Sequence, residues 1–195
     1  MTKYIKPIIV GFVVAFVISG GISFMVASAG GSAGWLPAFI GGFIGVFTAY
    51  IMANLAGNRA GRAAQPAQQE AALNLRPEPG RAMLIVFREG FVGMAAGMNV
   101  SVDGRVVAQL KSPRFTAIPL DVGRHEMQLA FGALAGAQNR AGVEEFGVGA
   151  GEVVAYRATV SMGALKNSVA LERITPDATL TAKLKAMKMV APEVG

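Results

Sequence analysis

The sequence predicts a membrane α-helical hairpin followed by an all-β domain, an antiparallel β-sandwich of about seven strands with a C-terminal amphipathic helix. Residues 7–58 contain no Asp, Glu, Lys, Arg or His, and this stretch is long enough to cross a bilayer twice, since one helical span needs about 20 apolar residues. From residue 81 onward, short β-type runs alternate with turn residues. We therefore expect four regions: a two-span hairpin (1–57), a linker (58–80), a β-sandwich (81–174), and a helix with a tail (175–195).

The glycine- and serine-rich segment 28–34 divides the apolar stretch into two predicted spans, residues 8–27 and 35–55. A cleaved signal peptide ending at Ala29 is an alternative for the first span, because Ala27 and Ala29 fit a small-residue cleavage site. The apolar run is longer than the roughly 7–15 residues of a signal sequence. This length favours a membrane span.

Lysine and arginine flank the apolar stretch and are absent from the loop inside it. Lys3 and Lys6 precede the first span, and Arg59 and Arg62 follow the second. Because positive charges are retained on the cytoplasmic side, we expect both termini and the β-sandwich to be cytoplasmic.

Small residues recur every four positions in both spans, as in helices whose backbones approach closely in lipid. An abundance of glycine and alanine without a packing role is the alternative. The partner of these faces is left open: the other half of the hairpin, another membrane protein, or a second copy of the chain. The predicted helix-packing residues are Gly11, Ala15, Ser19, Gly41, Gly45, Ala49 and Ala53.

Residues 58–80 are rich in Ala, Gln and Pro, which is typical of a linker. The predicted strands that follow include an apolar run at 83–87, which suits a buried strand, and a pair around Asp103-Gly104, a strong hairpin signal. With no helical period among them, they favour an antiparallel sandwich. The predicted strands are 83–87, 98–102, 105–110, 115–120, 125–131, 143–147, 153–160 and 167–174.

The turn pattern of this region resembles the PEGA-like and carboxypeptidase-regulatory-like β-sandwich modules of bacterial envelope proteins. Val102-Asp-Gly104 matches the first hairpin of those modules. Leu120-Asp-Val-Gly-Arg-His125 matches the start of their closing strand, with Val122 where the family prefers proline. The resemblance covers about residues 81–174. It implies a non-catalytic interaction or spacer module, and with the hairpin it implies a protein of the bacterial inner membrane.

Thr175-Pro176-Asp177 has the composition of a helix start, and Leu180, Leu184 and Met187 follow at helical spacing. The basic residues Lys183, Lys185 and Lys188 lie around these apolar positions and are candidates for contact with anionic lipid. Packing of the leucines on the β-sandwich is the alternative.

The sequence contains no recognisable catalytic motif. His125 is the only histidine and there is no cysteine, so we expect no metal site, no cofactor and no enzymatic activity. Asp103 and Asp121 lie in predicted turns, where Asp bonds its own backbone. Gly147–Gly151 lacks the Lys-Ser/Thr of a phosphate-binding loop.

Two predicted loops carry large apolar residues among glycines, which is typical of a contact with protein or lipid. Core filling is the alternative. The interface candidates are Phe91, Met94, Met98, Phe131 and Leu134.

These patterns lead us to expect an accessory or scaffolding subunit whose helices pack in the membrane and whose β-sandwich binds a protein. Its expected partners are membrane lipid and a membrane protein or a second copy. The net charge of +6 is not clustered as a nucleic-acid interface requires. A lipid- or envelope-sensing module and, less favoured, an enzyme are the alternatives.

Overall fold

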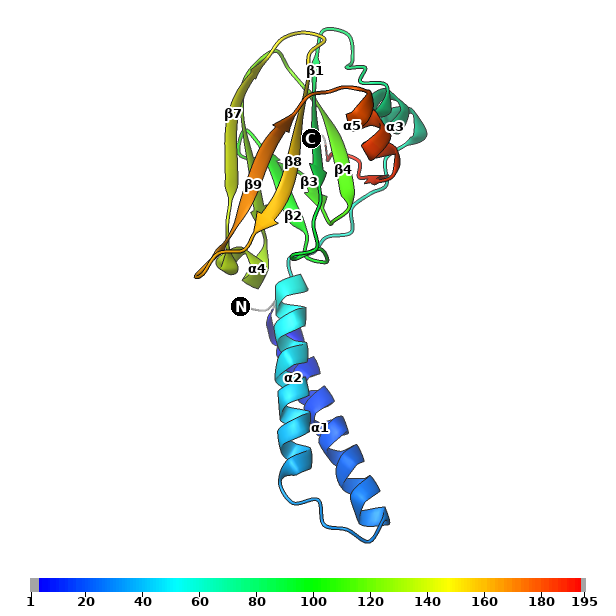
Figure 1. Cartoon of the computed structure of the whole chain (residues 1–195), viewed down its shortest axis with the longest axis vertical. Coiled ribbons are helices and arrows are strands. Elements are labelled where there is room, and N and C mark those ends of the chain that lie inside the picture. The colour runs from blue at the N-terminus through cyan, green and yellow to red at the C-terminus, as the bar shows by residue number, and fades with distance from the viewer. Residues whose placement is uncertain (1–3, 194–195) are drawn as a thin grey trace. The chain divides into compact units, whose positions relative to one another are not determined.

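The computed structural model describes residues 4–193. Contacts divide the chain into two units, residues 1–57 and residues 58–195, and Figure 1 shows a helical hairpin and a β-rich unit.

The hairpin consists of α1 (Ile5–Ser28) and α2 (Leu36–Leu55). Both helices are long and apolar enough to cross a membrane, as the sequence predicts. Helix α1 ends where Gly30 takes a positive φ of 76° and its N–H bonds the carbonyl of Ala27. Pro37 lies in the first turn of α2, where its missing N–H costs no helical hydrogen bond.

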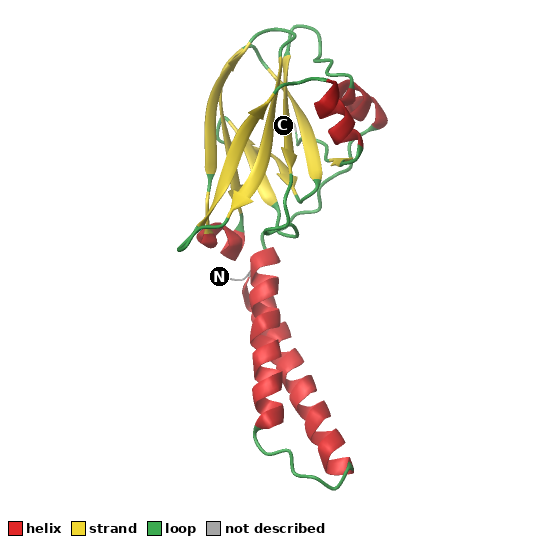
Figure 2. Cartoon of the chain, in the orientation of Figure 1, coloured by secondary structure: helices red, strands yellow, loops and turns green. Residues whose placement is uncertain are grey.

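The β-rich unit contains two sheets (Figure 2). The strand order is β10-β4-β1-β8-β9-β6 in the six-stranded sheet and β3-β2-β5-β7 in the four-stranded sheet. The strands are β1 (Ala82–Arg88), β2 (Met98–Val102), β3 (Arg105–Leu110), β4 (Arg114–Leu120), β5 (Gly123–Phe131), β6 (Asn139–Arg140), β7 (Gly142–Val148), β8 (Val153–Ser161), β9 (Asn167–Ile174) and β10 (Lys188–Met189).

The prediction of an entirely antiparallel arrangement is wrong. The four-stranded sheet is antiparallel, but the six-stranded sheet is mixed, with parallel pairs β1–β8, β4–β10 and β6–β9. All seven residues of β1 are buried, so this strand is covered on both faces and has a neighbour on each side. Such a two-sided apolar strand is typical of the middle of a sheet that has parallel neighbours.

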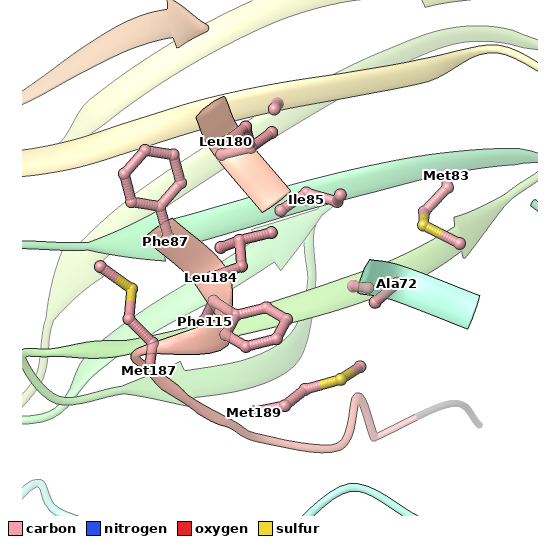
Figure 3. Packing of buried hydrophobic residues seen from close by; sticks show 11 residues of the cluster. Ala72, Met83, Ile85, Phe87, Phe115, Leu180, Leu184, Met187 and Met189 are labelled. Atoms are coloured by element: carbon pink, nitrogen blue, oxygen red, sulfur yellow. The ribbon is translucent and has the colours of Figure 1, made fainter. Parts of the chain in front are cut away.

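One face of the six-stranded sheet is covered by α3 (Pro66–Leu73) and α5 (Ala178–Lys185) (Figure 3). Leu180 and Leu184 of α5 are buried over Ile85 and Phe115 of the sheet. The predicted linker, 58–80, includes α3, whose Ala72 is fully buried in this cluster. The segment is therefore packed on the β-rich unit.

The C-terminal helix is shorter than the sequence pattern indicates. Its N-cap is Asp177, whose carboxylate accepts a hydrogen bond from the N–H of Leu180 at 2.9 Å, so Pro176 lies outside the helix. The helix ends at Lys185, and the N–H groups of Ala186 and Met187 close the last turn on the carbonyls of Lys183 and Leu184. Met189 then pairs with Phe115 as part of β10.

The connections between strands lie at two opposite ends of the β-rich unit. The α4 end, named after α4 (Ala133–Gln138), gathers the connections 89–97, 111–113, 132–141 and 162–166, because β1 and β8 run parallel and both finish there. The turn end gathers the connections 103–104, 121–122 and 149–152.

Candidate functional site

The small residues of the two apolar helices face one another. A Cβ added at Gly11 would lie 2.6 Å from the carbonyl oxygen of Gly45, and one added at Gly41 would lie 2.5 Å from that of Ala15. The Ser19 hydroxyl donates a hydrogen bond to the carbonyl of Pro37 at 3.0 Å. The helices therefore approach through nearly bare backbone.

The other members of the predicted packing set lie on the same interface or beside it. Ala49 is the neighbour that a side chain at Gly11 would meet, and Ala53 is partly buried one turn further along α2. The rings of Phe12 and Phe43 point away and are mostly exposed. Within the described hairpin, the two helices use their small-residue faces on each other.

The β-rich unit holds a buried cation, Arg88, at the end of β1. Its side chain is completely inaccessible to solvent. Its two terminal nitrogens donate hydrogen bonds to backbone carbonyls only: Nη1 to Ala96 (2.5 Å) and Leu110 (3.1 Å), and Nη2 to Gly93 (2.6 Å) and Val92 (3.5 Å).

The surroundings of Arg88 keep it charged and fix the loop 89–97. Burial lowers the pKa of Arg88 to about 10, which still leaves it protonated at neutral pH. Its guanidinium lies 4.8 Å from the ring centroid of Phe131, a favourable cation–π contact. Three of its four carbonyl partners belong to the loop, so Arg88 acts as the internal support of that loop.

The apolar loop candidates divide into exposed and buried residues. Phe91 is 84% exposed and Met94 is 41% exposed, whereas Met98 is fully buried and Phe131 is buried beneath Arg88. Leu134 is partly buried in α4. The structure thus leaves Phe91 and Met94 on the surface and uses Met98 and Phe131 in the core.

The same loop is tied to Asn58, the first residue of the β-rich unit. The side-chain amide of Asn58 donates to the carbonyl of Ala95 at 2.9 Å and accepts from the N–H of Gly97 at 2.6 Å. The next backbone N–H, that of Arg59, donates to the side chain of Gln109 at 2.6 Å. The loop 89–97 is therefore held against the first residues of the β-rich unit.

His125 joins the two predicted turn acids at the turn end. Its Nδ1 lies 2.7 Å from Oδ2 of Asp103, and its Nε2 lies 2.9 Å from the carbonyl oxygen of Asp121. Both contacts can be donated only by the protonated ring. Burial alone would lower the pKa of His125, but its hydrogen bonds to Asp103 and Asp121 and their negative charges raise it overall.

The pKa of Asp103 shifts the other way. Burial alone would raise it, but the hydrogen bonds from His125 and from the N–H of Glu126, with the charge of His125, lower the pKa of Asp103 overall. The cluster pins two turns to each other and is surrounded by solvent on the Asp103 side, where this side chain is 52% exposed. Its geometry fits a structural clasp.

We expect this clasp to make stability depend on pH. The raised pKa of His125 gives a contribution that is present below about pH 6.5 and is lost as pH rises through the folded-state value. The lowered pKa of Asp103 gives a contribution that is lost as acid protonates the carboxylate. Urea unfolding of the full chain in detergent should show His125→Gln losing on the order of 0.5 kcal/mol at pH 6, after allowance for solvent screening, and less at pH 8.5. An equal loss at both pH values would contradict this assignment.

The three lysines proposed for lipid contact have different surroundings. Lys183 makes an ion pair with Glu89 at 3.0 Å and lies 5.4 Å from the ring centroid of Phe87. Lys185 and Lys188 are exposed. Since Leu180 and Leu184 are buried against the sheet, α5 presents no apolar face for insertion into lipid.

A groove of about 620 Å³ lies beside β3, the edge strand of the four-stranded sheet. Its lining comes from both sheets and from the C-terminal segment, and it includes the exposed Val106 and the charged residues Asp103, Arg105 and Glu193. The N–H of Glu193 donates to the carbonyl of Val107 at 2.6 Å, so a backbone carbonyl of this strand accepts a hydrogen bond from another segment. The lining includes Val102, Val106, Val107, Ile118, Leu120 and Pro192.

Sequence reasoning missed Arg88, Asn58 and this groove. The available signal for Arg88 was an arginine at the end of an apolar strand, followed by a glycine-rich loop whose carbonyls are free to accept hydrogen bonds. Nothing local marks Asn58, because its partners lie 37 and 39 residues further along the chain.

No protein-family model and no curated protein matches this chain. Among residues 4–193, no three His, Cys, Asp or Glu side chains gather in a way that would hold a metal ion. The arrangement offers a groove beside the edge strand β3, a supported apolar loop and a closely packed helical pair.

Proposed function

We propose that this protein is a non-catalytic, membrane-anchored accessory or scaffolding subunit whose β-rich unit binds a protein partner. In this proposal the hairpin lies in a bacterial inner membrane with both termini and the β-rich unit in the cytoplasm, and the β-rich unit acts as a PEGA-like β-sandwich module. The resemblance of the turn sequences and the positive charges flanking the helices support this assignment.

The observation that carries the proposal is the groove at the β3 edge. A strand edge that already accepts a backbone hydrogen bond from Glu193 can pair with an extended peptide, and neighbouring apolar pockets can hold its side chains. The hairpin supports an anchoring role, because its small-residue faces are used internally. A partner is therefore expected on the β-rich unit.

The lipid-sensing alternative is favoured less in the form that uses α5. Leu180 and Leu184 are buried on the sheet, and Lys183 is engaged with Glu89. An interfacial helix needs an apolar face for the bilayer, but the apolar face of α5 is packed on its own sheet.

The proposal predicts that Val106→Glu abolishes partner binding. The carboxylate would place a charge among the apolar side chains of the groove, whereas Val143→Glu, at an exposed position on the opposite edge strand β7, would not. The measurement uses tagged full-length protein purified from its native membranes in mild detergent. The wild type and Val143→Glu should retain a partner at fixed stoichiometry. Val106→Glu should lose at least about 90% of the partner, since a buried unpaired charge costs well over 1.4 kcal/mol.

Two results would count against this function. A wild-type preparation that contains only a monomer, in every growth condition tried, would remove the partner. Equal retention by both variants would remove the groove as the binding site.

A further inference from the structure

Four large apolar side chains are exposed together at the α4 end of the two sheets. Phe91 and Met94 project from the loop after β1, and Met162 and Leu165 lie in the connection between β8 and β9. Met162 is 80% exposed and Leu165 is 95% exposed. Because β1 and β8 run parallel and in register, with Arg88 opposite Ala158, the two connections emerge at the same end.

The charge of this end differs from that of the other. The connections at the α4 end carry Lys111, Arg140 and Lys166, and their one acid, Glu89, is engaged with Lys183 and with Arg157. The turn-end connections 103–104, 121–122 and 149–152 carry three acids, Asp103, Asp121 and Glu152, which pair with His125, Arg81 and Arg173 in or next to the adjoining strands. The α4 end therefore combines exposed apolar groups with positive charge, the combination that suits an anionic lipid surface.

Chain connectivity limits how far this end can lie from the end of α2. Asn58 follows the end of α2 at Leu55 by three residues, a reach of at most about 10 Å, and its side chain is bonded to Ala95 and Gly97 of the apolar loop. The polar layer on each side of a bilayer is roughly 5–8 Å thick. The loop is thus held within reach of that layer, and Arg88 keeps it in shape from inside.

We propose that the α4 end of the β-rich unit docks on the surface of the bilayer that the hairpin spans, with Phe91, Met94, Met162 and Leu165 inserted at the level of the headgroups. The occupant of this apolar surface is lipid, attracted by Lys111, Arg140 and Lys166. This inference rests on the membrane anchorage in the proposed function but not on its protein partner.

The absence of cysteine from the chain allows a direct test with single-cysteine variants. Full-length Phe91→Cys, Leu165→Cys and Val122→Cys would each be labelled with bimane and reconstituted in vesicles of phosphatidylcholine and phosphatidylglycerol. Val122 is the matched control, because it is an exposed apolar residue in a turn at the opposite end. Phe43→Cys, in α2, reports whether the hairpin itself lies in lipid.

Quenching by nitroxide-bearing lipid should be at least about threefold stronger at positions 91 and 165 than at position 122, because apolar groups at these two positions would have left water. Iodide in the water should quench position 122 most. Replacing Phe91, Met94 and Met162 by serine should then lower lipid quenching at position 165 at least about twofold. Thermal unfolding of each variant checks that the β-rich unit remains folded.

The following outcomes would overturn the inference. The first is equal exposure of all three positions to iodide, and the second is protection from both iodide and lipid quencher, which would indicate a protein on this surface. The third is lipid quenching at position 165 that does not change in the serine variant. Lipid quenching at position 43 without any at positions 91 and 165 would refute docking alone, whereas its absence at position 43 would refute the anchorage.

Discussion

Replacing Arg88 with methionine is expected to lower the free energy of unfolding of the β-rich unit by about 3 kcal/mol. Methionine keeps most of the apolar volume but donates no hydrogen bond, so the carbonyls of Gly93, Ala96 and Leu110 lose their partner inside the fold. Each buried acceptor left unsatisfied costs about 1–3 kcal/mol, and rehydration of the displaced loop recovers part of this loss. Urea unfolding of the full chain in detergent, followed by circular dichroism, measures the change.

Arg157→Met is the matched control for this experiment. Arg157 lies on neighbouring β8 and pairs with Glu172 at a half-exposed position, so its loss should cost less than about 1 kcal/mol. Arg88→Lys should fall between the two variants, because lysine keeps the charge but cannot reach carbonyls on several sides with a planar group. A cost for Arg88→Met no greater than that for Arg157→Met would show that the buried guanidinium does not support the loop.

Gly45→Val is expected to force the two hairpin helices apart. A Cβ at this position would collide with the carbonyl oxygen of Gly11 and would lie 2.6 Å from the Cβ of Ala15. Overpacking of a close interface costs about 1–3 kcal/mol, and in lipid little hydrophobic force opposes separation. Spin labels at Ile8→Cys and Ile51→Cys, in reconstituted full-length protein, should give a broader and longer distance distribution in this variant.

Gly42→Val provides the control three residues away on the same helix. A Cβ added at Gly42 meets nothing within 4 Å, so this substitution makes the same change in volume and helix propensity without reaching α1. Its distance distribution should match that of the parent. Equal broadening in both variants would indicate an effect of valine on the helix itself.

The hairpin was predictable because its signal is local and long. The predicted spans, 8–27 and 35–55, differ from α1 and α2 by a few residues at the ends, where apolar composition cannot locate the last helical hydrogen bond. The small-residue spacing marked the positions that lie between the helices. The sequence did not show which helix they pack against, and the structure shows that it is the other half of the hairpin.

The strand positions were also close to those predicted, but their pairing was not. Alternation and turn residues mark where a strand begins and ends, and neighbouring strands joined by tight turns, such as β2 and β3, are antiparallel by necessity. The β1–β8 pair joins residues 83 and 153, and no local pattern specifies such a distant neighbour. The packing of helix α3 was not predictable, because Ala72, which has a small side chain, is its only buried residue.

The distance between β1 and β8 along the chain also has a consequence for biosynthesis. When Arg88 has been synthesised, about 65 residues remain before β8 begins at Val153, which at about 5–20 residues per second corresponds to roughly 3–13 s. During that time at least one edge of the most apolar strand has no partner. Slow, non-local pairing of this kind leaves a strand open to association with other chains. The nascent β-rich unit would therefore depend on shielding of β1 throughout this interval, and slower translation between residues 88 and 153 should increase aggregation of the new chain.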